Sequence, residues 1–244
     1  MDDDSPRSAY NDGFSRAARP GSADMTPQNF PDIAQQLIDV GKRFDARGWV
    51  LGTSGNFSSV LGHQPLKMAI TPSAAFKGDL RLDEIVEIDE YGTPVGAGRP
   101  SAEALIHLEV VRSRDAGAVL HTHSVWSTIL SDLHADEGGL FIEGYEMLKG
   151  LHGVLSHEHR EWIPIIDNDQ NMPRLAKAVG KTLDEFPAVH AFLLRRHGLY
   201  TWGDTLADAE RHVEILEFLF ETIARTRALA GTGEILTGGT AWRY

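Results

Sequence analysis

Short apolar runs alternate along this chain with longer segments in which apolar residues recur at helical spacing, and this alternation restricts it to folds that combine strands with helices. The short runs predict strands, because they are too brief for helices and end at turn residues. They cover residues 56–61, 67–71, 85–88, 116–122, 163–166 and 191–194. The first two flank the turn-forming segment Gly62-His-Gln-Pro65, so we expect them to pair.

Four segments show helical periodicity. The first carries Ile33, Leu37, Val40 and Phe44 before Gly48, a residue typical of helix ends. Serines precede the next two, where a hydroxyl can accept a hydrogen bond from a free backbone N–H. Ser101 precedes Leu105, Leu108 and Val111, and Ser124 precedes Trp126, Ile129 and Leu130. The last helix is predicted over residues 205–229, with one apolar stripe along its length.

The first 27 residues differ in composition from the rest of the chain. Residues 1–27 are rich in Asp, Ser, Gly, Arg and Pro without an apolar period, which predicts a flexible tail. Residues 28–244 are expected to form one α/β domain, because a chain of 244 residues with 42% apolar residues can bury a single large core.

The sequence does not indicate a nucleotide-binding loop. The glycine-containing segment Gly52-Thr-Ser-Gly55 has neither the spacing nor the lysine of such a loop.

The amino-acid composition limits which metal ligands and which partners the protein can have. The chain has no cysteine, so any transition-metal site must use histidine and carboxylate, and eleven histidines are present. The formal net charge of -12 argues against nucleic acid as a partner, although it does not exclude a small phosphorylated substrate. The sequence has neither an apolar stretch of membrane-spanning length nor a signal-peptide pattern, so we expect a cytoplasmic protein without a membrane partner.

The histidines near the end of the run at 116–122 are the strongest functional signal. His121 and His123 are two residues apart and would project from the same side of a strand. His197 follows the predicted strand at 191–194, and it could join them if the two strands are neighbours. Three histidines with an open fourth position are typical of catalytic zinc, which polarises a carbonyl group. We therefore predict one zinc ion held by His121, His123 and His197.

The remaining histidines give weaker signals. The pair His157-Glu-His159 lies in a polar stretch, and we interpret it as part of a solvated loop. Six others have no partner at ligand spacing and are expected to be surface or packing residues: His63, His107, His134, His152, His190 and His212.

Metal-assisted chemistry also needs a proton carrier, and two glutamates are candidates. Glu103 follows Pro100-Ser-Ala in the first turn of a predicted helix, where the helix dipole favours a negative charge, so a purely structural role is equally plausible. Glu146 lies among apolar residues that could desolvate it and raise its pKa toward that of a general acid or base. A solvated position for Glu146 is the alternative.

Three turns rich in hydroxyl groups could bind an anion. They are Gly52-Thr-Ser-Gly-Asn56, Thr71-Pro-Ser73 and the turn at Ser101. Each could equally be an ordinary turn or helix cap. All three lie before the predicted strand at 116–122 that carries His121, and the presence of three such turns there favours anion binding.

Five segments together resemble the class II aldolase/adducin family over about residues 30–230: Thr53-Ser-Gly-Asn56, Ile70-Thr-Pro-Ser73, Pro100-Ser-Ala-Glu103, His121-Thr-His123 and Arg196-His-Gly-Leu-Tyr200. Tyr145-Glu-Met-Leu-Lys-Gly150 and the stretch at 195–203 resemble the family's dehydratase subgroup more than its sugar-phosphate aldolases. That subgroup works in methionine salvage on a methylthio-substituted ketose 1-phosphate. The alternatives are an aldolase or 4-epimerase of the same family, and a non-catalytic adducin-like binding module.

The resemblance implies a three-layer α/β/α fold with a mainly antiparallel central sheet, and a homotetramer. It implies a zinc site at His121, His123 and His197, and catalytic roles for Glu146 and Glu103 whose division it leaves open. The implied substrate-binding residues, which would hold the phosphate group of a small ketose, are Gly55, Asn56, Thr71, Ser73, Lys77 and Ser101.

Overall fold

The computed structural model describes residues 29–236, with side chains through residue 230, so the tail predicted for residues 1–27 lies outside the described part. Within that part, eight strands form one sheet in the order β3-β2-β1-β4-β8-β7-β6-β5. The strands are β1 (Asn56–His63), β2 (Leu66–Ile70), β3 (Val86–Ile88), β4 (Ala118–Thr122), β5 (Gly139–Glu143), β6 (Arg160–Ile166), β7 (Ala191–Leu194) and β8 (Gly198–Gly203). The helices are α2 (Phe30–Ala46), α3 (Ala104–Arg114), α4 (Val125–Leu133), α5 (Met172–Glu185) and α6 (Leu206–Leu236), with short 3-10 helices η1 (Lys77–Asp79), η2 (Leu82–Glu84) and η3 (Glu146–Gly150).

The sheet is mixed, which corrects the expectation of a mainly antiparallel central sheet. Most neighbouring strands run antiparallel, including the β1–β2 hairpin and the β4–β8 pair. The exception is β6, which runs parallel to β7, with Ile165 opposite Leu193. A parallel pair needs a long crossover, and α5 provides it on one face of the sheet.

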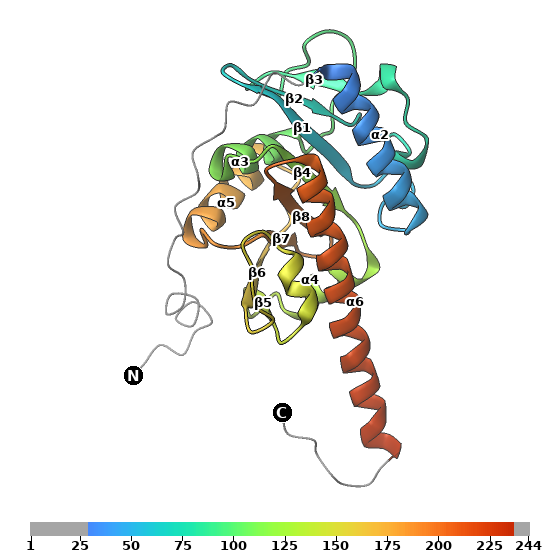
Figure 1. Ribbon diagram of the computed structural model, residues 1–244, viewed down its shortest axis with the longest axis vertical. Coiled ribbons are helices and arrows are strands. Elements are labelled where there is room, and N and C mark those ends of the chain that lie inside the picture. The colour runs from blue at the N-terminus through green and yellow to red at the C-terminus, as the bar shows by residue number, and fades with distance from the viewer. Residues whose placement is uncertain (1–28, 237–244) are drawn as a thin grey trace.

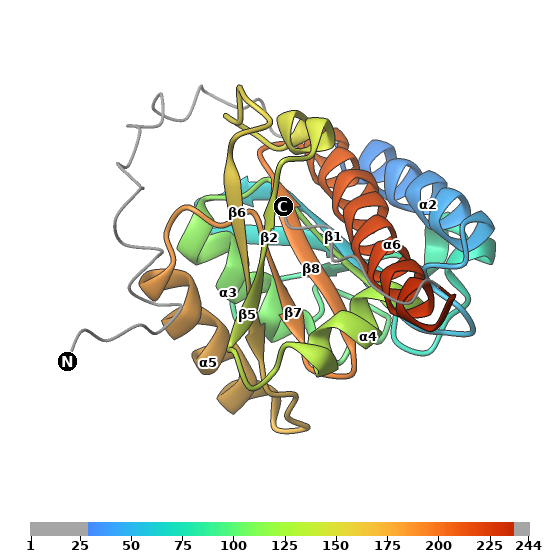
Figure 2. The same cartoon turned by 90° about the horizontal axis from the view of Figure 1, so that it is seen from below.

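Helices cover both faces of the sheet (Figures 1 and 2). Seen from below, α3 and α5 lie on one side of the strands, and α2, α4 and α6 lie on the other (Figure 2). One buried apolar cluster joins α3 and α5 to the sheet. Two further clusters fill the opposite side, one under α2 and the start of α6, the other under α4, η3 and the middle of α6. The predicted three-layer arrangement is therefore confirmed.

The predicted elements are all present; the strand at 191–194 has the predicted ends, and the ends of the others shift by a few residues. The strand at 56–61 extends to His63, so Gln64 and Pro65 alone separate it from β2. Ser124 caps α4 as predicted, because its hydroxyl accepts a hydrogen bond from the Ser127 N–H. The α3 stripe is broader than predicted, since Ile106 and Val110 are buried and Leu105 is half-buried. Two strands, β5 and β8, and one α-helix, α5, were not predicted from the sequence, and neither were the short 3-10 helices.

None of the helices within residues 29–236 is both long enough and apolar enough to cross a membrane.

Helix α2 packs against η1 at a position that only glycine permits. Its apolar face, which includes Ile33, Leu37 and Phe44, is buried. On the same face, a Cβ added at Gly41 would lie 2.2 Å from the carbonyl oxygen of Lys77. This close approach fixes the segment that carries Lys77 against the helix, and it explains a glycine in the interior of a helix, where it is otherwise unfavourable.

We predict that Gly41→Ala lowers the free energy of unfolding by roughly 1–3 kcal/mol, because overpacking against a backbone atom outweighs the gain in helix propensity. The matched control is Gly180→Ala in α5, where the added Cβ meets only the movable carboxylate of Glu109. The control should be neutral or more stable by up to about 1 kcal/mol. Urea unfolding of the three proteins checks this, and equal effects of the two substitutions would contradict it.

Candidate metal centre and active site

The three predicted histidine ligands converge at one end of the sheet. His121 is the penultimate residue of β4, His123 follows that strand directly, and His197 lies in the turn between β7 and β8. The Nε2 atom of His121 lies 2.7 Å from that of His123 and 3.3 Å from that of His197. The predicted convergence is therefore present in the structure.

The strand that brings His197 into place is β8, which the sequence did not predict. It pairs antiparallel with β4, so Thr122 lies opposite Leu199 and the β7–β8 turn meets the end of β4. A Cβ at Gly198 would lie 2.0 Å from the Thr122 carbonyl oxygen, so glycine is required next to His197. The expected neighbour of β4 was the strand at 191–194, but β8 lies between them.

The neighbours of His121 fix its orientation. Its Nδ1 atom lies 2.8 Å from the carbonyl oxygen of Leu199, which can only accept, so Nδ1 carries the proton and Nε2 keeps its lone pair. The Tyr200 ring stacks on the imidazole at a centroid distance of 3.9 Å. A ligating histidine commonly donates its second ring N–H to a carbonyl in this way.

Burial keeps these imidazoles neutral. It lowers the pKa of His121 well below the ordinary value, and the neighbouring His123 and His197 lower it further. Burial also lowers the pKa of His123 to about 3. Neutral imidazoles with converging Nε2 atoms form the donor set that zinc prefers, so these residues fit such an ion.

Glu103 lies beside two of the three histidines. Its Oε2 atom is 3.5 Å from Nε2 of His121, and its Oε1 atom is 3.5 Å from Nε2 of His197. It occupies the N-cap position of α3 without capping the helix through its side chain. Instead, the Asn56 side chain donates a hydrogen bond of 2.5 Å to Oε2. This carboxylate can therefore contact a bound metal or take a proton from a substrate.

His107 supports this arrangement, although the sequence suggested only a packing role. The Nε2 atom of His107 bonds to Oδ1 of Asn56, and Ser58 lies 2.7 Å from Nδ1. Burial lowers the pKa of His107 to about 3, so the ring is neutral. Because Asn56 accepts from Nε2, its amide nitrogen is directed at Glu103. The available sequence signal was spacing, since His107 follows Glu103 by one helical turn.

The predicted anion-binding segments are also brought together. The Lys77 ammonium donates to the carbonyl oxygens of Thr53 and Ala75, at 3.1 and 2.7 Å. Burial lowers the pKa of Lys77 to about 8, and Glu103 opposes that effect. The backbone N–H of Ser101 donates to the Thr71 carbonyl oxygen, which joins two of the turns.

Some polar groups of these turns already have partners. The Thr71 hydroxyl accepts a hydrogen bond from the Phe57 N–H, and the Ser101 hydroxyl accepts one from the Glu103 N–H. The Ser73 N–H donates to the Arg99 carbonyl oxygen. Asn56 is turned toward Glu103, as described above. Gly55 adopts a positive φ of 70° at the start of β1, where a side chain would collide with Val50.

Glu146 does not have the environment suggested by its apolar neighbours. It lies at the start of η3 and its side chain is 73% exposed. The Lys149 ammonium lies 2.7 Å from its carboxylate, and this hydrogen bond lowers its pKa rather than raising it. Among the described residues, no hydrogen bond or ion pair joins Glu146 to the three histidines. The expected desolvation was therefore wrong for this single chain, because η3 presents Glu146 outward.

The interpretation of residues 157–159 as a solvated loop is half correct. His157 is exposed and lies 3.8 Å from Glu146. His159 instead turns inward and lies 2.7 Å from the buried carboxylate of Glu161. His190, expected to lack a partner, contacts the same carboxylate at 3.0 Å.

The sequence is similar to a known protein family and to enzymes of one name within it. The profile of the class II aldolase and adducin N-terminal domain matches residues 35–224. The methylthioribulose-1-phosphate dehydratase of Methylococcus capsulatus is 44% identical over 202 residues, which cover 82% of this chain and 97% of that protein. The enzyme of the same name from Pseudomonas fluorescens is 43% identical over 199 residues, covering 81% and 94% respectively.

Solved structures agree on the fold. An L-fuculose 1-phosphate aldolase superposes with a TM-score of 0.68 at 25% identity, covering 81% of this chain and 87% of its own. The protein YgbL from Klebsiella pneumoniae superposes with a TM-score of 0.69 at 24% identity, covering 81% and 91%.

A buried acid lies behind β4. Glu217 of α6 is 2% exposed and accepts a hydrogen bond of 2.7 Å from the Thr122 hydroxyl, between His121 and His123 in the sequence. Burial raises its pKa to about 7, despite the opposing hydrogen bonds from Ser124 and Thr122. In the folded protein this group therefore binds a proton up to a higher pH than it does in the unfolded chain.

We predict that Glu217 makes folding less favourable as pH rises from about 4.5 to about 7, because the folded state binds the extra proton in that window. Glu217→Gln should therefore gain up to about 3 kcal/mol over the wild type between pH 5 and pH 8. Urea unfolding at both pH values measures the difference. The control is Glu214→Gln, a half-exposed position on the same helix, and its profile should parallel that of the wild type. Parallel profiles for Glu217→Gln would contradict the assignment.

Proposed function

The chain belongs to the class II aldolase and adducin family, and we propose that it dehydrates 5-methylthioribulose 1-phosphate to 2,3-diketo-5-methylthiopentyl 1-phosphate. The observation that carries this proposal is the similarity to methylthioribulose-1-phosphate dehydratases over nearly their whole length. The chain would then be a hydro-lyase of methionine salvage.

The proposed cofactor is one catalytic zinc ion, held by His121, His123 and His197. The close approach of their Nε2 atoms and the neutrality of the buried rings support this set. When bound, the ion supplies a Lewis acid that draws electron density from the substrate carbonyl at C2. Glu103, next to two of these histidines, would help to balance the charge at the site.

The phosphate is proposed to lie at the turns that precede β1 and α3. Positive φ at Gly55 and the buried Lys77 ammonium support a site where backbone N–H groups and one cation meet an anion. Hydroxyl groups that accept a backbone hydrogen bond can still donate their own proton to phosphate. The proposed contacts are those predicted from the sequence: Gly55, Asn56, Thr71, Ser73, Lys77 and Ser101.

Two proton transfers are needed for the dehydration. We assign the first to Glu103, which would take the proton from C3 so that the electron pair of that bond moves into the C2–C3 bond. The pair then expels the C4 hydroxyl as Glu146 delivers a proton to it, and water leaves. The resulting enol becomes the diketone when C4 is protonated.

Glu146 must lose its solvent exposure to act as this acid, because a solvated carboxyl group is ionised at neutral pH. A bound substrate or a neighbouring subunit could cover it. We propose a cytoplasmic homotetramer in which a second copy closes the site. Exposed apolar side chains in the segments next to the site, Leu51, Phe76 and Val125, support such a contact.

Two other functions remain as alternatives. A sugar-phosphate aldolase or 4-epimerase would use the same metal centre, and the likeness to an L-fuculose 1-phosphate aldolase keeps this alternative open. An adducin-like binding module needs no metal, so the converging histidines argue against it.

The product distinguishes these functions. We predict that the zinc-loaded protein converts 5-methylthioribulose 1-phosphate to the diketone, and that a chelator stops the reaction without unfolding the protein. Diketone formation can be followed alongside the release of a three-carbon ketose phosphate. Cleavage to the three-carbon product would instead identify an aldolase, and turnover by the metal-free protein would contradict the role of zinc.

A second experiment identifies the residue that donates a proton to the leaving C4 hydroxyl. Glu146→Gln should lower kcat by at least about 10²-fold, because the isosteric amide cannot deliver a proton, while zinc content stays unchanged. The matched control is Glu143→Gln at the end of β5, an exposed residue near Glu146 in sequence, and it should retain activity. Near-normal turnover by Glu146→Gln would move the acid role to Glu103.

A further inference from the structure

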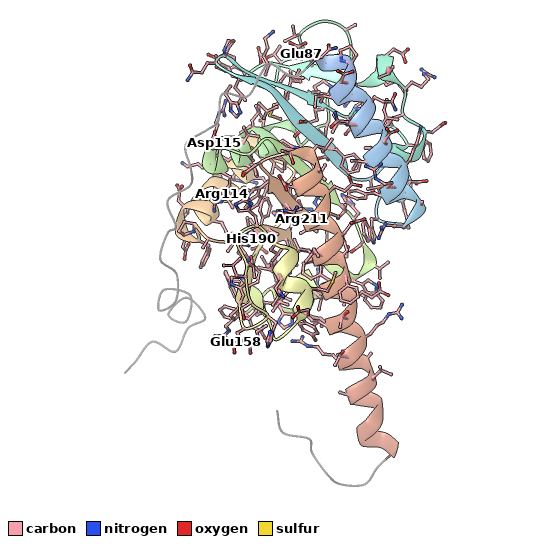
Figure 3. All side chains as sticks on the ribbon, in the orientation of Figure 1. Glu87, Arg114, Asp115, Glu158, His190 and Arg211 are labelled. Carbon is pink, nitrogen blue, oxygen red and sulfur yellow. The ribbon has the colours of Figure 1, made fainter. Side chains whose placement is uncertain are left out.

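A second group of possible metal ligands lies outside the site described above. His159 precedes β6, Glu161 is the second residue of that strand, and His190 directly precedes β7 (His190 is labelled in Figure 3). One ligand atom from each of the three lies within 4.8 Å of the others, as in the group of His121, His123 and His197. No part of the proposed reaction uses these residues.

The carboxylate at the centre of this group is fully buried. The Glu161 side chain is 1% exposed. Burial by itself would raise its pKa, but the charge of His190 and the hydrogen bonds from His159 and His190 lower it to about 2. A buried charged carboxylate is costly unless cations or several donors compensate it. Such compensation can come from the imidazole rings alone or from a metal ion.

The orientation of His190 favours metal coordination. Its Nε2 atom lies 2.8 Å from the His152 carbonyl oxygen, which can only accept, so Nε2 carries a proton. Its Nδ1 atom is thereby directed at Oε2 of Glu161, 3.0 Å away. The other carboxylate oxygen accepts the backbone N–H of His190 at 3.0 Å. Metal-binding histidines and carboxylates are commonly held by such second partners.

We propose that His159, Glu161 and His190 form a second metal site, separate from the histidine triad, that binds zinc or a similar divalent first-row ion. The ligand atoms would be Nε2 of His159, Oε2 of Glu161 and Nδ1 of His190. Two imidazole nitrogens and one carboxylate oxygen, with water as a fourth ligand, are a set that zinc accepts. The side chains of His159 and His190 are 20% and 16% exposed, so an ion can enter from solvent.

An ion at this position would stabilise the loop at 144–159. That loop joins β5 to β6, carries Glu146 on η3, and ends at His159. His152 in the same loop accepts from His190 and donates its backbone N–H to Nε2 of His212 in α6. The ion would therefore tie the loop to β6 and β7. Its effect on catalysis rests on the proposed function, but the binding of the ion does not.

Zinc stoichiometry tests the proposal without using activity. The wild-type protein, dialysed against Zn²⁺ and analysed for metal content, should hold about two ions per chain. His159→Ala and the triad variant His197→Ala should each hold about one, and the double variant should hold none. His157→Ala is the matched control, because this exposed histidine lies two residues away, and it should keep about two.

The ion proposed at His121, His123 and His197 also reports on folding. A variant that still binds this ion has kept the part of the sheet that brings the three histidines together. If His159→Ala lost both ions, the milder His159→Gln would be measured instead, with an expected content of about one. About one ion in the wild-type protein, or about two in the variant at position 159, would overturn the proposal. The group would then be an imidazole–carboxylate ion pair only. Neither result depends on which substrate the protein uses.

Discussion

The pairing of β4 with β8 is the constraint on which the rest of the site depends. It aligns Thr122 with Leu199, which carries the turn containing His197 to the end of the strand that supplies His121. The close approach is possible because Gly198 has no side chain to collide with the Thr122 carbonyl group. Backbone hydrogen bonds in a sheet are rigid, so three imidazoles are brought together at little further entropic cost.

Hydrogen bonds and burial around the three histidines set the position and the charge of the other groups at the site. The bonds from His107 to Asn56 and from Asn56 to Glu103 place a carboxylate beside the proposed metal ligands. Burial keeps the ligand histidines neutral and leaves Lys77 as a buried cation near the turns proposed to bind phosphate. The acid candidate, Glu146, lies on an exposed segment instead, which is consistent with a site that is completed by substrate or by another subunit.

The sequence predicted the layers of the fold and singled out His121 and His123 as a candidate ligand pair, because apolar periodicity and the two-residue spacing of these histidines are local signals. It missed α5, although Leu175, Val179 and Leu183 recur there at helical spacing, and it missed β8, whose residues run from Gly198 to Gly203 without alternation. It also missed the partners of His107 and His190. Those contacts join residues far apart in the chain, and a single sequence carries no signal for such pairs.

The proposed zinc site requires that His121, His123 and His197 together hold the catalytic ion. The most direct test is a crystal structure of the zinc-loaded protein with data collected at the zinc absorption edge. We predict an anomalous peak at roughly 2.0–2.1 Å from all three Nε2 atoms. If that position were empty while zinc was bound elsewhere in the protein, the assignment of the active site would be contradicted.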